Sequence, residues 1–385
     1  MINKNRFLKK LVNLCILSLF IMAGLNLFDQ NSYWILSLKP YYLKTHLEIL
    51  KRENINSING KALSSKQAKT ANSIPVLLYH GILDKTDGDN ITLNEFSDQM
   101  FKLKKAGYET VTLDELTSFM RGEKQLSEKS FVLTFDDGNK NSFYPADPIL
   151  KKLDYEAAIF IISDHSIKNP YNFHLSVKEL KVMDKSKRWD IQAHTQNGHS
   201  EPLIDKSGKT GHFFSDLLWL DNKDRLETPS EFEKRVVSDM QTVKKDIEKE
   251  FDKKVDYFTF PFGDYGQESK NFPDSEEILL RRSREIYSYT LSQADLKEGS
   301  PLNCPSTDPF MIKRIIVKPG WRGESLVKVF EEVQKTPCDQ NFVLPDHILE
   351  SSIKKSDNLS SLNFQYFKNS ILEETSRFLW TKLIQ

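Results

Sequence analysis

Short apolar blocks alternate with longer amphipathic segments between residues 74 and 334. The apolar blocks are rich in β-branched and aromatic residues, as buried strands are, and cover residues 74–79, 131–135, 157–162, 190–194, 257–260, 287–291 and 312–317. Segments with helical periodicity occupy residues 95–106, 148–153, 177–184, 230–251, 275–285 and 324–334. Strands separated by helices pair in parallel, so this order predicts a doubly wound sheet or a (β/α) barrel. About seven such units favour the α/β barrel.

The amino terminus has the pattern of a membrane anchor. Four basic residues within residues 1–10 precede an 18-residue apolar stretch, residues 11–28, which is close to the minimum length of a transmembrane helix. Basic residues stay on the cytoplasmic side, so the remaining chain is expected outside the cell membrane. A cleaved signal peptide is the competing interpretation. No small-residue cleavage motif follows the apolar stretch, which favours an uncleaved, single-pass anchor.

Three further segments follow the anchor. Residues 29–72 are polar and rich in Lys, Ser and Asn, which predicts a stalk or linker. Residues 73–337 carry the strand and helix pattern and are predicted to form the main domain. Residues 338–385 are predicted to be a C-terminal extension with an amphipathic helix, which packs on the main domain or contacts the membrane surface.

Composition restricts the classes of partner and of site. The chain of 385 residues has 54 Lys and Arg against 54 Asp and Glu, so its formal net charge is zero. Nucleic-acid binding normally requires a strongly basic surface and is not expected. Three cysteines exclude a disulfide framework and a cysteine-rich zinc site, and whether Cys304 and Cys338 pair is left open.

Candidate catalytic groups follow two of the predicted strands. One strand runs into Asp136, Asp137 and a glycine, and another ends in His194, followed five residues later by His199. An Asp-Asp-Gly sequence is also an ordinary turn. However, active sites of barrels form at the carboxyl ends of the strands, and two histidines with a carboxylate are the open ligand set of a catalytic zinc ion. The coincidence of both motifs at strand ends therefore favours a divalent metal site, with zinc as the expected ion.

Two other strand ends carry groups that would complete such a site. The strand at residues 257–260 leads into Pro261, Phe262 and a glycine, and this turn could present the Phe262 N–H to a developing oxyanion. The first strand ends in Tyr79 and His80. A histidine in this place is either a core or capping residue or a functional group.

These motifs resemble those of the polysaccharide deacetylases, carbohydrate esterase family 4, whose catalytic unit is the NodB homology domain. The resemblance covers residues 74–333, and its most specific motif is Thr-Phe-Asp-Asp-Gly. It implies a distorted, seven-stranded NodB-type barrel. It also implies that Asp136 is the general base and that Asp137, His194 and His199 bind one divalent metal ion, expected to be Zn²⁺.

Three details resemble one branch of this family, the deacetylases of poly-N-acetylglucosamine exopolysaccharide in biofilms. They are the histidine spacing of five instead of four, the Leu-Leu-Tyr-His-Gly sequence of the first strand, and the Phe-Pro-Phe-Gly turn. For this substrate we expect contacts with Tyr79, Pro261 and Trp321.

The chain also departs from the family pattern at two places. The family has an arginine two residues before the proline of its third motif, where this chain has Thr259, so no arginine partner for the base is predicted. The histidine that usually acts as general acid in the fifth motif is replaced by Lys-Pro-Gly-Trp321. His80 is the nearest candidate for the general acid.

The resulting hypothesis is a metal-dependent N-deacetylase of a cell-surface polysaccharide, anchored in the membrane with its catalytic domain outside. Poly-N-acetylglucosamine exopolysaccharide is the expected substrate, and peptidoglycan N-acetylglucosamine is the alternative. An alternative of another class is a catalytically weak carbohydrate-binding protein, in which Phe262, Tyr265 and Trp321 stack on sugar rings.

Overall fold

The computed structural model describes residues 44–50, 52, 69–169, 173–294, 296, 299–345 and 348. The predicted anchor at residues 11–28, most of the predicted linker and the predicted C-terminal helix lie outside the described residues. Within the described part of the chain, no helix is long and apolar enough to cross a membrane.

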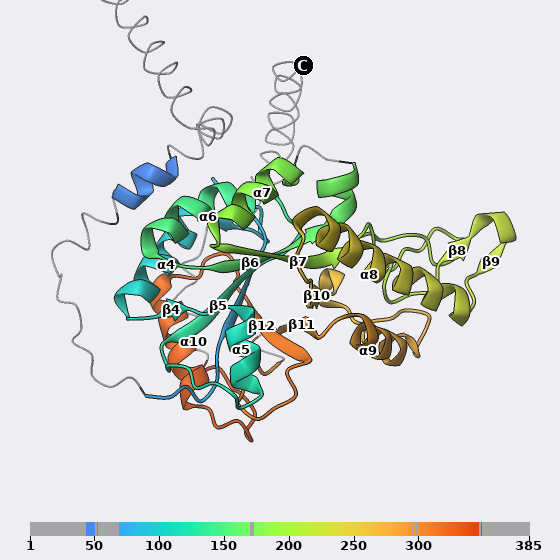
Figure 1. The fold of residues 1–385 in the computed structure, drawn as a ribbon. Coiled ribbons are helices and arrows are strands. Elements are labelled where there is room, and N and C mark those ends of the chain that lie inside the picture. The colour runs from blue at the N-terminus through green and yellow to red at the C-terminus, as the bar shows by residue number, and fades with distance from the viewer. Residues whose placement is uncertain are drawn as a thin grey trace, which may run out of the picture.

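A closed barrel of parallel strands forms the centre of the molecule (Figure 1). Its strands are β1 (Val76–Tyr79), β5 (Ser130–Phe135), β6 (Ala157–Ile162), β7 (Trp189–Thr195), β10 (Tyr257–Thr259), β11 (Tyr289–Ala294) and β12 (Met311–Ile316). The order around the barrel is β1, β12, β11, β10, β7, β6, β5, and β5 pairs again with β1. A short strand, β4 (Glu109–Thr110), is added at the start of β5. The predicted α/β barrel with seven strands is confirmed.

Helices surround this barrel on its outside (Figure 1). They are α4 (Leu93–Lys105), α5 (Leu113–Met120), α6 (Lys140–Leu153), α7 (Val177–Ser186), α8 (Pro229–Phe251), α9 (Ser275–Ile286) and α10 (Gly323–Lys335). Capping boxes fix several helix starts, as where Thr92 and Glu95 satisfy each other's backbone N–H groups before α4. The strands β5 and β6 are buried along their whole length, which explains their continuous apolar sequences.

Short elements occupy the connections. The pairs are β2 (Ile82–Leu83) with β3 (Ile91–Thr92), and β8 (Trp219–Leu220) with β9 (Arg225–Leu226). The β8–β9 hairpin projects away from the barrel beside α8 (Figure 1). The single-turn helices are η3 (Asp164–Lys168), η4 (Asp221–Lys223) and η5 (Pro261–Gly263).

Helix α6 begins well before the predicted start at residue 148. Proline disfavours a helix interior because it has no N–H to donate, yet α6 contains Pro145 and Pro148. Its apolar face, which includes Ile149 and Leu150, is fully buried. Tertiary packing thus overrides the local preference on which the prediction rested. Helix α5 was not among the predicted elements.

Part of the predicted linker packs on the barrel domain instead of acting as a spacer. Residues 44–50 are helical, and Ile49 is buried in the main hydrophobic cluster. Arg52 contacts Asp98 of α4 at 2.7 Å. At the other end of the described chain, a disulfide bond joins Cys304, in the loop before β12, to Cys338, after α10. The structure thus shows that Cys304 and Cys338 pair, which the sequence left open.

Candidate metal centre and active site

A tight backbone turn after β5 determines the orientation of Asp136 and Asp137. Asp136 directly follows the strand, and its N–H donates to the carbonyl of Tyr79 at 3.0 Å. Asp137 and Gly138 both have positive φ angles, 70° and 69°. Aspartate tolerates this conformation better than most residues. Glycine is required at position 138, because a Cβ there would lie 2.9 Å from a methyl carbon of Ile161.

Asp137, His194 and His199 form a cluster of potential metal ligands. The Asp137 Oδ1 atom lies 3.5 Å from His194 Nε2 and 3.6 Å from His199 Nε2, and the three ligand atoms lie within 4.8 Å of one another. Although the two histidines are five residues apart instead of four, both imidazoles therefore still reach the same Asp137 oxygen. The second Asp137 oxygen, Oδ2, accepts a hydrogen bond from Asn139 at 3.3 Å, which fixes the carboxylate plane.

Neighbouring elements orient the two histidines. The Nδ1 atom of His194 lies 2.8 Å from the carbonyl of Thr259 at the end of β10, so with the proton on Nδ1 the Nε2 lone pair faces Asp137. The loop before His199 is held by Asp239 of α8, whose carboxylate accepts the N–H groups of Gln196 and Asn197 at 2.8 and 2.9 Å. Asp239 has no place in the sequence motifs and was not predicted.

The residues of this cluster fit a divalent metal ion. Among the described residues, Asp137 Oδ1 is buried and has no hydrogen-bond partner, as expected for an oxygen that faces a cation. Burial and the neighbouring His194 lower the pKa of His199 to about 4, so this imidazole is neutral at pH 7, as a ligand must be. Burial opposes ionisation of Asp137, but the neighbouring His194 and the charge of His80 hold its pKa below the usual value.

An arginine that sequence reasoning did not predict pairs with Asp136. Arg314 of β12 is fully buried, and its Nη1 and Nη2 atoms donate to the two Asp136 oxygens at 2.7 and 2.8 Å. Burial alone would raise the pKa of Asp136, but the charge of Arg314 outweighs it and lowers that pKa. The carboxylate thus remains ionised, as a general base requires.

His80 lies beside the same carboxylates. Tyr79 of β1 is paired with Phe135 of β5, so His80 and Asp136 are the next residues of two neighbouring strands. The charge of His80 contributes to the lowered pKa of both Asp136 and Asp137. The structure therefore brings His80 to the same end of the barrel as the candidate ligands.

The Pro-Phe-Gly turn borders the cluster. The Phe262 ring lies 4.3 Å from the His199 ring, centroid to centroid, and Phe262 has the left-handed angles φ 59° and ψ 5°. No hydrogen bond from the Phe262 N–H to another described residue is present, whereas the next two N–H groups, of Gly263 and Asp264, donate within the turn at 3.2 and 3.0 Å. The Phe262 N–H is thus available at the edge of the cluster.

The expected substrate contacts of three residues need correction. Tyr79 is 2% exposed and donates to Gln99, and Trp321 is 6% exposed and belongs to the main hydrophobic cluster. Pro261 is buried as well. Tyr79 and Trp321 therefore pack in the interior and Pro261 is buried, so we no longer expect these side chains to contact a polysaccharide.

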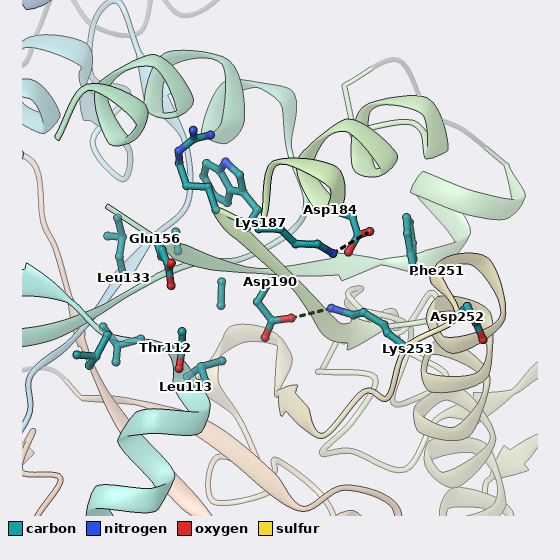
Figure 2. Close-up of a pocket in the computed structure, with 16 residues that line it drawn as sticks. Thr112, Leu113, Leu133, Glu156, Asp184, Lys187, Asp190, Phe251, Asp252 and Lys253 are labelled. Carbon is teal, nitrogen blue, oxygen red and sulfur yellow. Dashed lines mark hydrogen bonds and ion pairs between the residues drawn. The ribbon is translucent and has the colours of Figure 1, made fainter. Parts of the chain in front are cut away.

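A separate pocket of about 330 Å³ lies at the opposite end of the barrel (Figure 2). It is lined by the first residues of β6 and β7, whereas Asp136 and His194 lie at the carboxyl ends of their strands. Its charged groups are largely paired, as Lys253 is with Asp190 at 2.6 Å. We assign no chemistry to this pocket.

The structure thus combines a seven-stranded parallel barrel with a candidate metal centre, the Asp-His-His cluster, at the carboxyl ends of its strands. The family model described as polysaccharide deacetylase matches residues 123–273. The Bacillus subtilis protein YxkH is 32% identical over 154 residues, which are 40% of this chain and 50% of that protein, so the match spans only half of that relative's length.

Two further comparisons cover more of the chain. The poly-β-1,6-N-acetyl-D-glucosamine N-deacetylase of Staphylococcus aureus is 24% identical over 261 residues, 66% of this chain and 78% of that protein. The solved de-N-acetylase of Aggregatibacter actinomycetemcomitans has a TM-score of 0.55 at 22% identity, over 67% of this chain and 99% of that one, and shows the same fold. Residues 123–273 of this chain thus match the polysaccharide deacetylase family, and the barrel has the fold of a solved de-N-acetylase.

Proposed function

We propose that the protein removes acetyl groups from N-acetylglucosamine units of a cell-surface polysaccharide, in a metal-dependent hydrolysis. The observation that carries this proposal is the convergence of an Arg-paired carboxylate, Asp136, with the three-ligand cluster around Asp137 at one end of the barrel. Poly-N-acetylglucosamine exopolysaccharide is the proposed polymer. The Staphylococcus aureus relative, named for this substrate, supports the choice because it aligns with two thirds of the chain.

Asp137, His194 and His199 would hold the divalent ion, and zinc suits a set of two imidazoles and one carboxylate. Such an ion, when bound, supplies a water molecule of lowered pKa and a polarised acetyl carbonyl. The ligand atoms are preorganised for it by Thr259 and Asn139, as described above.

The remaining steps belong to the side chains and backbone of the protein. Asp136 takes the proton of the attacking water, because Arg314 keeps this carboxylate ionised. The Phe262 N–H donates to the oxygen of the tetrahedral intermediate. His80 gives a proton to the departing amine, for which an imidazole is suited near neutral pH.

We also propose that the protein is anchored in the cell membrane through residues 11–28, with its barrel outside. The disulfide between Cys304 and Cys338 supports an oxidising, extracytoplasmic location. Protease added to intact cells should then cleave the barrel domain, and complete protection of the chain would reverse this orientation.

Acetate release tests the reaction and the substrate together. The full-length chain, purified in detergent without chelators, is incubated with poly-β-1,6-N-acetylglucosamine and, separately, with peptidoglycan. We expect faster acetate release from the exopolysaccharide. Faster release from peptidoglycan would assign the enzyme to that polymer, and saccharide binding without acetate release from either would identify it as a carbohydrate-binding protein.

A further inference from the structure

A second histidine pairs with a buried carboxylate next to the Phe262 turn. The Nδ1 atom of His212 lies 2.6 Å from Oδ2 of Asp264, and Asp264 is completely buried. The other oxygen, Oδ1, accepts the N–H groups of Gly266 and Glu268 at 2.9 and 3.3 Å. Asp264 therefore fixes both the chain that follows the turn and the imidazole of His212.

The His212 ring lies flat on the ring of Phe262. Their centroids are 4.4 Å apart and the planes differ by 11°. Phe262 also contacts the ring of His199, at 4.3 Å between centroids. Phe262 thus contacts both a candidate metal ligand and an imidazole that has no place in the proposed reaction.

The loop that carries His212 is fastened to the segment after the turn at several further points. The His212 N–H donates to the buried Asp216 at 2.9 Å, and Asp216 in turn accepts the N–H of Lys270 at 2.5 Å. Asn271 exchanges two hydrogen bonds of 2.9 Å with the backbone of Leu217. This arrangement gives the His212 ring a fixed position relative to the turn.

The backbone of Phe262 needs such support. A side chain larger than that of asparagine or aspartate rarely adopts a positive φ, and a residue held there requires surroundings that determine its conformation. With φ at 59°, Phe262 forms a turn in which the Gly263 and Asp264 N–H groups donate locally, while the Phe262 N–H has no partner among the described residues. If the ring lost its support, the N–H would move with it.

We propose that His212 and Asp264 are positioning residues, which hold Phe262 in the left-handed conformation that presents its N–H to the acetyl oxygen. The inference rests on the proposed function, because it assigns the pair a role in that reaction. The loop between β7 and α8, which carries His212, thereby contributes to catalysis without touching the reacting atoms.

Three variants test the pairing in the full-length protein. His212→Ala removes both the ring and the hydrogen bond, whereas His212→Phe retains a ring to stack on Phe262. Lys209→Ala, an exposed position of the same loop, is the matched control. Removal of one oxyanion donor costs about 10²-fold in kcat or more. We expect His212→Ala to lower kcat by about 10-fold to 10²-fold with KM within threefold, and His212→Phe to recover most of this loss.

Three readouts separate this role from others. The kcat loss should be equal on an N-acetyl amide and on an acetyl ester, because both pass through an oxyanion, and zinc content should stay at the wild-type value. In the Phe262→Gly background the effect of His212→Ala should shrink below threefold, because glycine adopts a positive φ without support. A raised KM with unchanged kcat, a loss on the amide alone, or full additivity with Phe262→Gly would overturn the inference.

An activity-independent measurement keeps this inference separate from the proposed function. In an amide NMR spectrum, the Phe262 and Gly263 resonances should shift in His212→Ala and not in Lys209→Ala. Unchanged resonances in His212→Ala would refute the positioning role even if the enzyme is active. A wild-type protein that releases no acetate, but whose Phe262 resonance responds to His212→Ala, would refute the proposed function and leave the positioning of the turn intact.

Discussion

Replacement of Arg314 by methionine removes the guanidinium that contacts both oxygens of Asp136 at 2.7 and 2.8 Å. The two side chains are 0% and 1% exposed, so water cannot take over the lost hydrogen bonds. Removal of one partner from a buried ion pair typically costs about 3–5 kcal/mol of the free energy of unfolding. We expect a loss of this size at pH 7, measured by urea denaturation of the metal-free protein.

The loss should depend on pH in a defined direction. In the wild type, Arg314 holds the pKa of Asp136 below its unfolded value, so the pair contributes stability above pH ~4 that disappears as pH falls through the folded pKa. In the variant, burial has lost its strongest opposing charge and the pKa of Asp136 is higher than in the wild type, so less of the stability gained from the ionised carboxylate remains as pH rises. The difference in stability between wild type and Arg314→Met should therefore be larger at pH 7 than at pH 4.

The same change should alter catalysis. A general base must be ionised, so the acid limb of the pH–rate profile of acetate release should move to higher pH in Arg314→Met. Lys313→Met, at the adjacent and partly exposed position of β12, is the matched control. An unmoved acid limb together with a stability loss under about 1 kcal/mol would refute the role of Arg314.

Three further predictions concern single groups. Asp136→Asn should retain bound metal, measured by elemental analysis, and lose most deacetylation; near-normal turnover would remove the base assignment. His80→Asn should lose much more rate on an acetamide than on an ester whose leaving group needs no proton, and equal losses on both would mark His80 as structural or sugar-binding. A Cys304→Ser/Cys338→Ser double variant should lose about 4 kcal/mol of unfolding free energy in urea, since the bond closes a loop with a sequence separation of 34; an unchanged midpoint would show that the bond is dispensable.

The barrel could be predicted from the sequence because strands such as β5 and β6 are buried on both faces and are therefore continuously apolar. Metal ligands could be predicted because they lie at or just beyond the carboxyl ends of strands, as Asp137 lies two residues after β5. The role of Arg314 could not be predicted, because its pairing with Asp136 depends on closure of the barrel. Closure places β12 beside β1 and β1 beside β5. A weak signal was present: Arg314 is one of two adjacent charged residues, with Lys313, in an otherwise apolar strand.

The predictions from the sequence failed where they depended on the direction of a side chain or on contacts between residues far apart in the sequence. Tyr79 and Trp321 were placed at the barrel mouth by their position after strands, but the sequence does not determine which way a strand-end side chain turns, and both are buried. His212 lies in a loop without a motif. Its contact with Asp264 spans 52 residues of sequence and depends on the fold of the whole loop.

The metal dependence of acetate release tests the central claim most directly. The full-length protein is stripped with a chelator, reloaded with one equivalent of zinc, and compared with His199→Ala treated in the same way. We predict that stripped wild type releases no acetate from poly-β-1,6-N-acetylglucosamine, that one zinc ion per chain restores the rate, and that His199→Ala neither retains the ion nor recovers. Undiminished acetate release by the stripped wild type, or by His199→Ala without metal, would contradict the account.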